Sequence, residues 1–164
     1  MAHVDYFLKI PGVEGESTDE AHGGEIEISS WSWGEVNDTT IESGTSGGGA
    51  GRVVMQDFTF TMRMNKATPT LMIYCAGGTH IPGPVVLTTR RAGDKPQEYF
   101  FIRMKNVYVS SYQTGGSSGN IVPEDVVSLS FGEIEFGYKP QVSEKGDLGA
   151  EIKAGWDVQK NVKK

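Results

Sequence analysis

Residues 5–17 have the sequence DYFLKIPGVEGES, in which an apolar or aromatic residue stands at every second position, Tyr6, Leu8 and Ile10, up to a Pro-Gly step. Tyr6 and Leu8 fall on one side of this stretch, and Asp5 and Lys9 fall on the other. Period-two alternation is typical of a β-strand with one buried face. The Pro-Gly step and the glycines after it predict that this strand ends in a turn.

The same alternation recurs along most of the chain. In residues 25–33, Ile26 and Ile28 fall on one face, whereas Trp31 and Trp33 fall on the face that carries Glu25 and Glu27. Because both faces carry large apolar side chains, we expect other parts of the protein or a partner to shield both faces from water. Further strands are predicted within residues 53–64, 85–91, 99–112 and 126–136.

One segment is predicted to be a helix, residues 68–77. Thr68 is the expected N-cap, Pro69 the expected first helical residue, and the pair Gly77-Gly78 the expected end. Leu71 and Cys75 are four residues apart, as on one face of a helix.

Many strands with a single short helix do not fit a βαβ pattern. We therefore expect a mainly β fold: a small antiparallel β-barrel of two packed sheets with one short flanking α-helix, forming a single domain over residues 1–164. Residues 43–51 are rich in glycine and serine and are expected to form a loop. Residues 139–164 form a more polar C-terminal segment in which Trp156 is expected to dock on the body.

Composition narrows the function classes. The net charge is −6, and residues 1–51 contain ten of the 21 acidic residues but only one of the 15 basic residues. Because the basic residues are dispersed, nucleic-acid binding is not expected. The single cysteine, Cys75, excludes a disulfide framework within the chain. The sequence shows neither a long apolar run nor a basic leader followed by one, so we expect no membrane span and no Sec-type signal peptide.

Ser17, Asp19 and His22 include the residue types of a hydrolase triad, but no nucleophile elbow surrounds Ser17. We expect these residues to stabilise a turn after the first strand. The other histidines, His3 and His80, are not spaced as metal ligands, and no P-loop or dinucleotide fingerprint is present. We therefore expect no metal, no cofactor and no enzymatic activity.

Several of these features occur together in one known family. They are the opening residues 7–17 with Asp19 and His22, the run Trp31-Ser32-Trp33-Gly34, the helix start Ala67-Thr68-Pro69 and the closing Gly155-Trp156-Asp157. Their order and spacing resemble the Hcp family (haemolysin-coregulated proteins) of type VI secretion tube proteins. The resemblance implies a phage tail-tube-like barrel. It also implies an extended inter-strand loop, whose counterpart in this chain is residues 37–54.

The resemblance also implies a function. Hcp-like subunits close into rings of six that stack into a hollow tube, so the expected partners are other copies of the chain, type VI tip and sheath components, and small effector proteins carried in the ring. The protein would be made in the cytoplasm and then secreted through the type VI system without a cleaved signal peptide. The residues expected at subunit or ring interfaces are Trp31, Trp33, Thr39, Thr40, Ile41, Ser43, Thr45, Ser46, Val53 and Trp156.

Three other interpretations remain open from the sequence. The first is a β-barrel that binds a small apolar ligand. It would be a monomer, whereas the tube protein would form a ring. The second is a phage-like tail-tube protein, which shares the architecture. The third is a hydrolase that uses Ser17 and His22.

Overall fold

The computed structural model describes residues 3–37 and 52–164. Its strands are β1 (Val4–Lys9), β2 (Ile26–Glu27), β3 (Ser30–Ser32), β4 (Glu35–Asn37), β5 (Val53–Met55), β6 (Phe58–Arg63), β7 (Val85–Arg91), β8 (Gln97–Gly115), β9 (Glu124–Tyr138), β10 (Ile152–Asp157) and β11 (Val162–Lys163). The helix α1 (Ala67–Gly77) lies between β6 and β7. The fold is mainly β with one short helix, as the sequence predicts.

The main sheet is antiparallel and closes on itself. β1 pairs with β7, β7 with β8, β8 with β9, β9 with β6, and β6 with β3. Residues 26–32 complete the circuit, because β2 pairs with β1 while β3 pairs with β6. Between them, the amide of Ile28 donates to the carbonyl of Tyr6 at 3.1 Å and the amide of Ser29 donates to the carbonyl of Thr61 at 2.8 Å. A closed circuit leaves no open edge in this part of the sheet.

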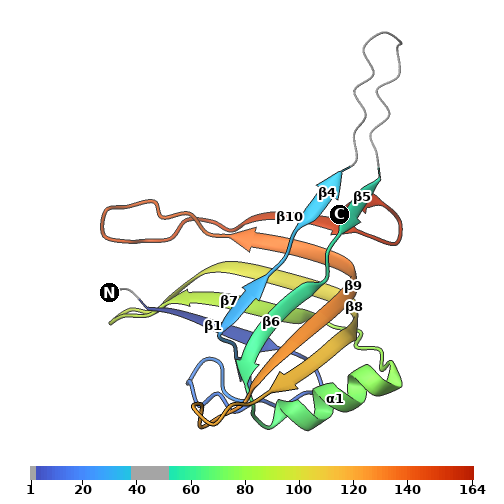
Figure 1. Ribbon diagram of the computed structural model, residues 1–164. Coiled ribbons are helices and arrows are strands. Elements are labelled where there is room, and N and C mark those ends of the chain that lie inside the picture. The colour runs from blue at the N-terminus through green and yellow to red at the C-terminus, as the bar shows by residue number, and fades with distance from the viewer. Residues whose placement is uncertain (1–2, 38–51) are drawn as a thin grey trace, which may run out of the picture.

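Two shorter parts extend from this barrel. β10 continues the sheet beyond β9, and β11 pairs with β10. β4 and β5 form a separate two-stranded antiparallel sheet. Figure 1 shows β4 and β5 projecting from the barrel beside β10.

The core fills the barrel interior. Its largest fully buried side chains come from strands on all sides of the barrel, and they include Leu8, Phe58, Phe60, Leu87, Ile102, Met104 and Leu129. The helix α1 packs against β8 with Leu71 fully buried. Trp156 packs against the core from β10, so the C-terminal segment docks on the body.

The helix begins one residue earlier than the sequence predicts, and Thr68 is not its N-cap. The side chain of Asn65 accepts a hydrogen bond from the amide of Ala67 at 2.8 Å, and the amide of Asn65 donates to the hydroxyl of Thr68 at 3.1 Å. This reciprocal pair has the geometry of a capping box, in which two otherwise unpaired amides are satisfied. The helix ends as predicted, with Gly78 in the left-handed conformation at φ 61°.

Two predicted strands are interrupted, and the interruptions change which faces are buried. A bend at Ser29 separates β2 from β3, so Trp31 packs on the core together with Ile26 and Ile28 instead of facing away from them. Likewise, the run over residues 53–64 is broken between β5 and β6. Met64 lies beyond the end of β6 and is 39% exposed.

Candidate functional site

The structure brings three of the predicted interface residues into one groove. Trp33, Val53 and Trp156 belong to segments far apart in sequence, and all three line a groove of about 660 Å³ between the β4–β5 sheet, β9 and β10. The other lining residues are Glu35, Asn37, Met55, Ile134, Phe136, Ala154, Gly155 and Asn161. The groove is therefore mainly apolar, and Glu35 is the one charged residue among the described residues that line it.

The indole group of Trp33 in this groove is held by aromatic contacts with Phe131 and Phe136. The ring of Trp33 lies edge-on to Phe136 at a centroid distance of 5.3 Å. In the part of the chain that the structure describes, the buried Nε1 atoms of Trp33 and Trp156 have no hydrogen-bond partner. A buried indole N–H usually has a partner, so a rearrangement that supplies one would be stabilising.

Trp31 lies elsewhere, against the barrel core. Its ring stacks on Phe58 and Phe100 at centroid distances of 6.0 and 5.9 Å, and Tyr6 contacts it edge-on. Trp31 remains half-buried, so an interface role stays a prediction. The predicted interface residues Thr39, Thr40, Ile41, Ser43, Thr45 and Ser46 lie outside the described residues.

The predicted loop over residues 37–54 begins and ends in strands, because Asn37 belongs to β4 and Val53 to β5. Val36 and Val54 are direct cross-strand partners, and they are 60% and 64% exposed. The groove is lined by their neighbours in each strand, so this valine pair faces the opposite way. The two-stranded arm thus has a groove on one side and an exposed apolar pair on the other.

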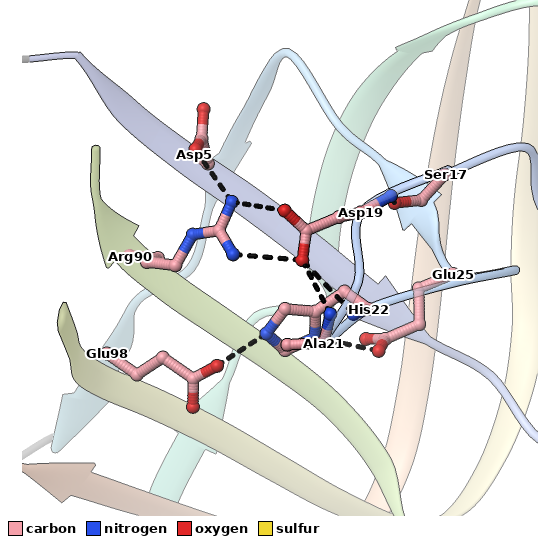
Figure 2. Close-up of polar contacts among 8 residues, drawn as sticks. All are labelled: Asp5, Ser17, Asp19, Ala21, His22, Glu25, Arg90 and Glu98. Carbon is pink, nitrogen blue, oxygen red and sulfur yellow. Dashed lines mark hydrogen bonds and ion pairs between the residues drawn. The ribbon is translucent and has the colours of Figure 1, made fainter. Parts of the chain in front are cut away.

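A second cluster of polar side chains surrounds the predicted turn. Asp5 of β1, Arg90 of β7 and Glu98 of β8 are register partners in neighbouring strands. Figure 2 shows Asp19 and His22 reaching from the loop after β1 toward Arg90 and Glu98. Arg90 binds Asp19 through both terminal nitrogens, at 2.9 and 2.6 Å, and binds Asp5 at 3.2 Å.

His22 lies between two carboxylates. Its Nδ1 atom is 2.7 Å from Glu25, and its Nε2 atom is 2.5 Å from Glu98. Burial opposes protonation of the imidazole, but the hydrogen bonds to Glu98 and Glu25 outweigh this cost and raise the pKa of His22 above 6.5. The hydrogen bond from Arg90 lowers the pKa of Asp19 to about 2.

This arrangement does not form a hydrolase triad. Both ring nitrogens of His22 are engaged by carboxylates, and the Ser17 hydroxyl accepts a hydrogen bond from the amide of Asp19 at 3.3 Å. Ser17 and Asp19 therefore stabilise the turn, as expected from the sequence. Across residues 3–37 and 52–164, no group of three His, Cys, Asp or Glu side chains is placed to hold a metal ion.

Sequence reasoning missed Arg90, Glu98 and Glu25 as partners in this cluster. Arg90 is 71 residues from Asp19, and Glu98 is 76 residues from His22. The pairing of β1 with β7 and of β7 with β8 creates these contacts, and a single sequence does not reveal strand pairing. Within the described segments, no helix is long and apolar enough to cross a membrane.

Comparisons with known proteins agree with one another. Residues 7–138 match the family described as "Type VI secretion system effector, Hcp". The chain is 42% identical to protein hcp1 of Pseudomonas aeruginosa over 160 residues, which cover 97% of this chain and 98% of that protein.

Solved structures give the same result. A structure described as that of a type six secretion system protein has a TM-score of 0.86 and 32% identity, covering 99% of this chain and all of the other. Hcp1 from Salmonella typhimurium has a TM-score of 0.82 and 34% identity, with both chains fully covered. A chain of the anti-feeding prophage baseplate has a TM-score of 0.50 at 9% identity over 83% of this chain and 93% of that one, a likeness of fold alone.

Proposed function

Because this chain belongs to the Hcp family of type VI secretion proteins, we propose that it is a structural subunit of the secretion tube. Six copies close into a ring, rings stack into the inner tube, and the ring lumen carries small effector proteins. The protein acts by assembly, without catalysis. It is made in the cytoplasm and leaves the cell through the type VI system, with the tip and sheath components as its other partners.

One observation carries the assembly proposal: the β4–β5 arm and the groove beside it. A two-stranded sheet is marginally stable by itself, so an arm that projects from the barrel gains stability from a partner surface. The exposed pair of Val36 and Val54 gives this arm an apolar face. A closed ring needs a head-to-tail interface between two different surfaces, and this arm supplies one of them.

The test is native mass by light scattering behind a sizing column. A closed ring of six 17.8 kDa chains has a mass of about 107 kDa. We expect Val54→Glu to shift the protein to smaller species, because it places a charge on the apolar face of the arm.

Val142→Glu is the matched control. Val142 has the same exposed fraction as Val54, 64%, but lies between β9 and β10. We expect this variant to remain a ring. A wild-type protein that stays monomeric would contradict the assembly proposal, and equal effects of the two variants would contradict the role of the arm.

The groove also favours one alternative, a monomeric barrel that binds a small apolar ligand. Its volume, about 660 Å³, lies within the range of small-molecule sites, and aromatic residues line it. Under this alternative the native mass is that of one chain, and an apolar probe such as anilinonaphthalene sulfonate changes the fluorescence of Trp33 and Trp156. A ring of six that shows no such change excludes it.

A further inference from the structure

The loop of residues 15–25 is fastened to the barrel at two points. Its own ends are joined by backbone hydrogen bonds from Gly15 to Gly24 and from Ser17 to Glu25, at 2.8 and 3.0 Å. Beyond these, Asp19 binds Arg90 of β7, and His22 binds Glu98 of β8. The two contacts hold different halves of the loop.

The contacts of His22 require a protonated ring. A neutral imidazole has one N–H donor and one acceptor nitrogen, whereas imidazolium has two donors. Both nitrogens of His22 face carboxylate oxygens, and an ionised carboxylate can only accept hydrogen bonds. Loss of the proton from His22 therefore turns one of these two contacts into a repulsion between a nitrogen lone pair and a carboxylate.

The charges around His22 come from each element packed against it. Its own loop contributes Asp19 and Glu25, β8 contributes Glu98, and β7 contributes Arg90, which also holds Asp5 of β1. Four carboxylates thus surround Arg90 and His22. A neutral His22 would leave Arg90 as the one cation of this described cluster, so the cluster favours the protonated form.

The loop covers an aromatic residue on the outside of the barrel. Phe7 is 2% exposed yet points away from the core, since its neighbour Leu8 lies within the core. The imidazole of His22 stacks on the Phe7 ring at 4.4 Å and 8°, and the Arg90 guanidinium lies 4.7 Å from the centre of that ring. Opening of the His22 half of the loop would expose this ring to water.

We propose that residues 20–25 form a proton-dependent clasp, closed by the His22 imidazolium between Glu25 and Glu98 and opened when that ring loses its proton, while the barrel stays folded. Asp19 stays bound to Arg90 after the clasp opens, because neither group titrates in that range. This is a property of each subunit and does not depend on ring assembly.

The sign of the pH dependence follows from the raised pKa of His22. When folding raises the pKa of a group, its protonation stabilises the folded state. This stabilisation is fully present below the pKa of the unfolded state, near 6.5 for histidine, and it is lost as the pH rises through the higher pKa of the folded state. The clasp is therefore closed in mildly acidic solution and opens toward alkaline pH.

The test is hydrogen exchange by mass spectrometry on the full-length protein between pH 5.5 and 9, with exchange times scaled for the intrinsic effect of pH. We expect the peptide that contains residues 20–25 to lose protection as pH rises, while β6 remains protected. Glu98→Gln keeps the size of the side chain but removes its charge, and we expect it to move the opening down by about one pH unit.

His22→Gln removes the titrating group, and we expect the opening of residues 20–25 to become independent of pH. His80→Gln is the matched control on another histidine, and we expect it to behave as the wild type. Protection of β6 in every variant shows that the barrel is folded. Protection that does not change with pH in the wild type, or a pH dependence that survives in His22→Gln, would overturn the proposal.

Discussion

Arg90 joins three parts of the chain. It binds Asp5 of β1 and Asp19 of the loop, and its guanidinium covers Phe7. Its side chain is only 12% exposed. We expect Arg90→Met to lower the free energy of unfolding by roughly 2 kcal/mol at pH 7, because two carboxylates lose a charge-assisted partner. Chemical denaturation followed by circular dichroism measures the change.

Arg91→Met is the control for this prediction, because Arg91 is the next residue and is exposed. We expect it to change the stability by less than about 0.5 kcal/mol. The Asp19 contact contributes stability above the ordinary carboxyl pKa of 3.8, and this contribution is lost as the pH falls toward about 2. A difference between Arg90→Met and the wild type that stays constant down to pH 2 would contradict the role of Asp19.

The sequence predicted part of this cluster. Ser17 and Asp19 have side chains that bond to nearby backbone amides, and such local contacts follow from residue type and spacing. The contacts of His22 and Asp19 with Glu98 and Arg90 depend on which strands become neighbours. The packing of the whole barrel determines which strands pair, so a local sequence pattern does not predict these contacts.

At the level of elements, Thr68 links the start of α1 to the sheet. Its hydroxyl accepts from the amide of Asn65 and donates to Asp125 of β9 at 2.7 Å. Asp125 is fully buried, and its other side-chain partner is the hydroxyl of Tyr112. We expect Thr68→Val to destabilise the protein by about 2 kcal/mol, since it leaves a buried carboxylate and an amide short of a partner. Thermal unfolding measures this effect.

Thr70→Val is the matched change on the same helix, and we expect it to be close to neutral. Equal losses from the two variants would show that valine harms the helix by propensity alone. The sequence located this helix to within one residue, because glycine at its end and apolar spacing are local signals. The predicted N-cap was wrong. Thr68 lies in the first turn of the helix, and the side chain of Asn65 is the one that accepts a hydrogen bond from the amide of Ala67, the first helical residue.

The strands were predicted well where alternation is unbroken, as in β7 and in the central parts of β8 and β9. The predicted face of Trp31 was wrong, because a bend at Ser29 reverses which face the next residues present. Such a bend is needed where one segment leaves β1 and joins β6 to close the barrel. Period-two reasoning assumes a continuous strand and does not show where the face changes.

For the whole molecule, the pairing of distant segments sets the rate of folding. Val4 pairs with Arg91, and Phe58 pairs with Leu129. Folds dominated by such non-local pairs reach the native state in milliseconds to seconds. We expect the concentration-independent phase of refolding, followed by stopped-flow fluorescence of the tryptophans, to fall in that range.

Trp31→Phe tests whether Trp31 reports this step, because its ring stacks on Phe58 and Phe100 from two different strands. We expect the variant to keep the rate but lose most of the fluorescence change. A main phase complete within microseconds would contradict the barrel as the cooperative unit. A fluorescence change that is undiminished in the variant would show that Trp33 or Trp156 reports the step instead.

The central place of β9 has a consequence for how the protein is made. β9 is the pairing partner of β6, β8 and β10. While a ribosome has synthesised only the residues before Glu124, β6 and β8 each display a bare row of amides and carbonyls, on which a neighbouring nascent chain could pair. The edges of β6 and β8 therefore stay unpaired until the 15 residues of β9 have been synthesised, and three-quarters of the chain is already made before this strand begins. Slow elongation would lengthen this vulnerable interval, so the codons before and within β9 are the place where translation speed should matter most to the yield of folded protein.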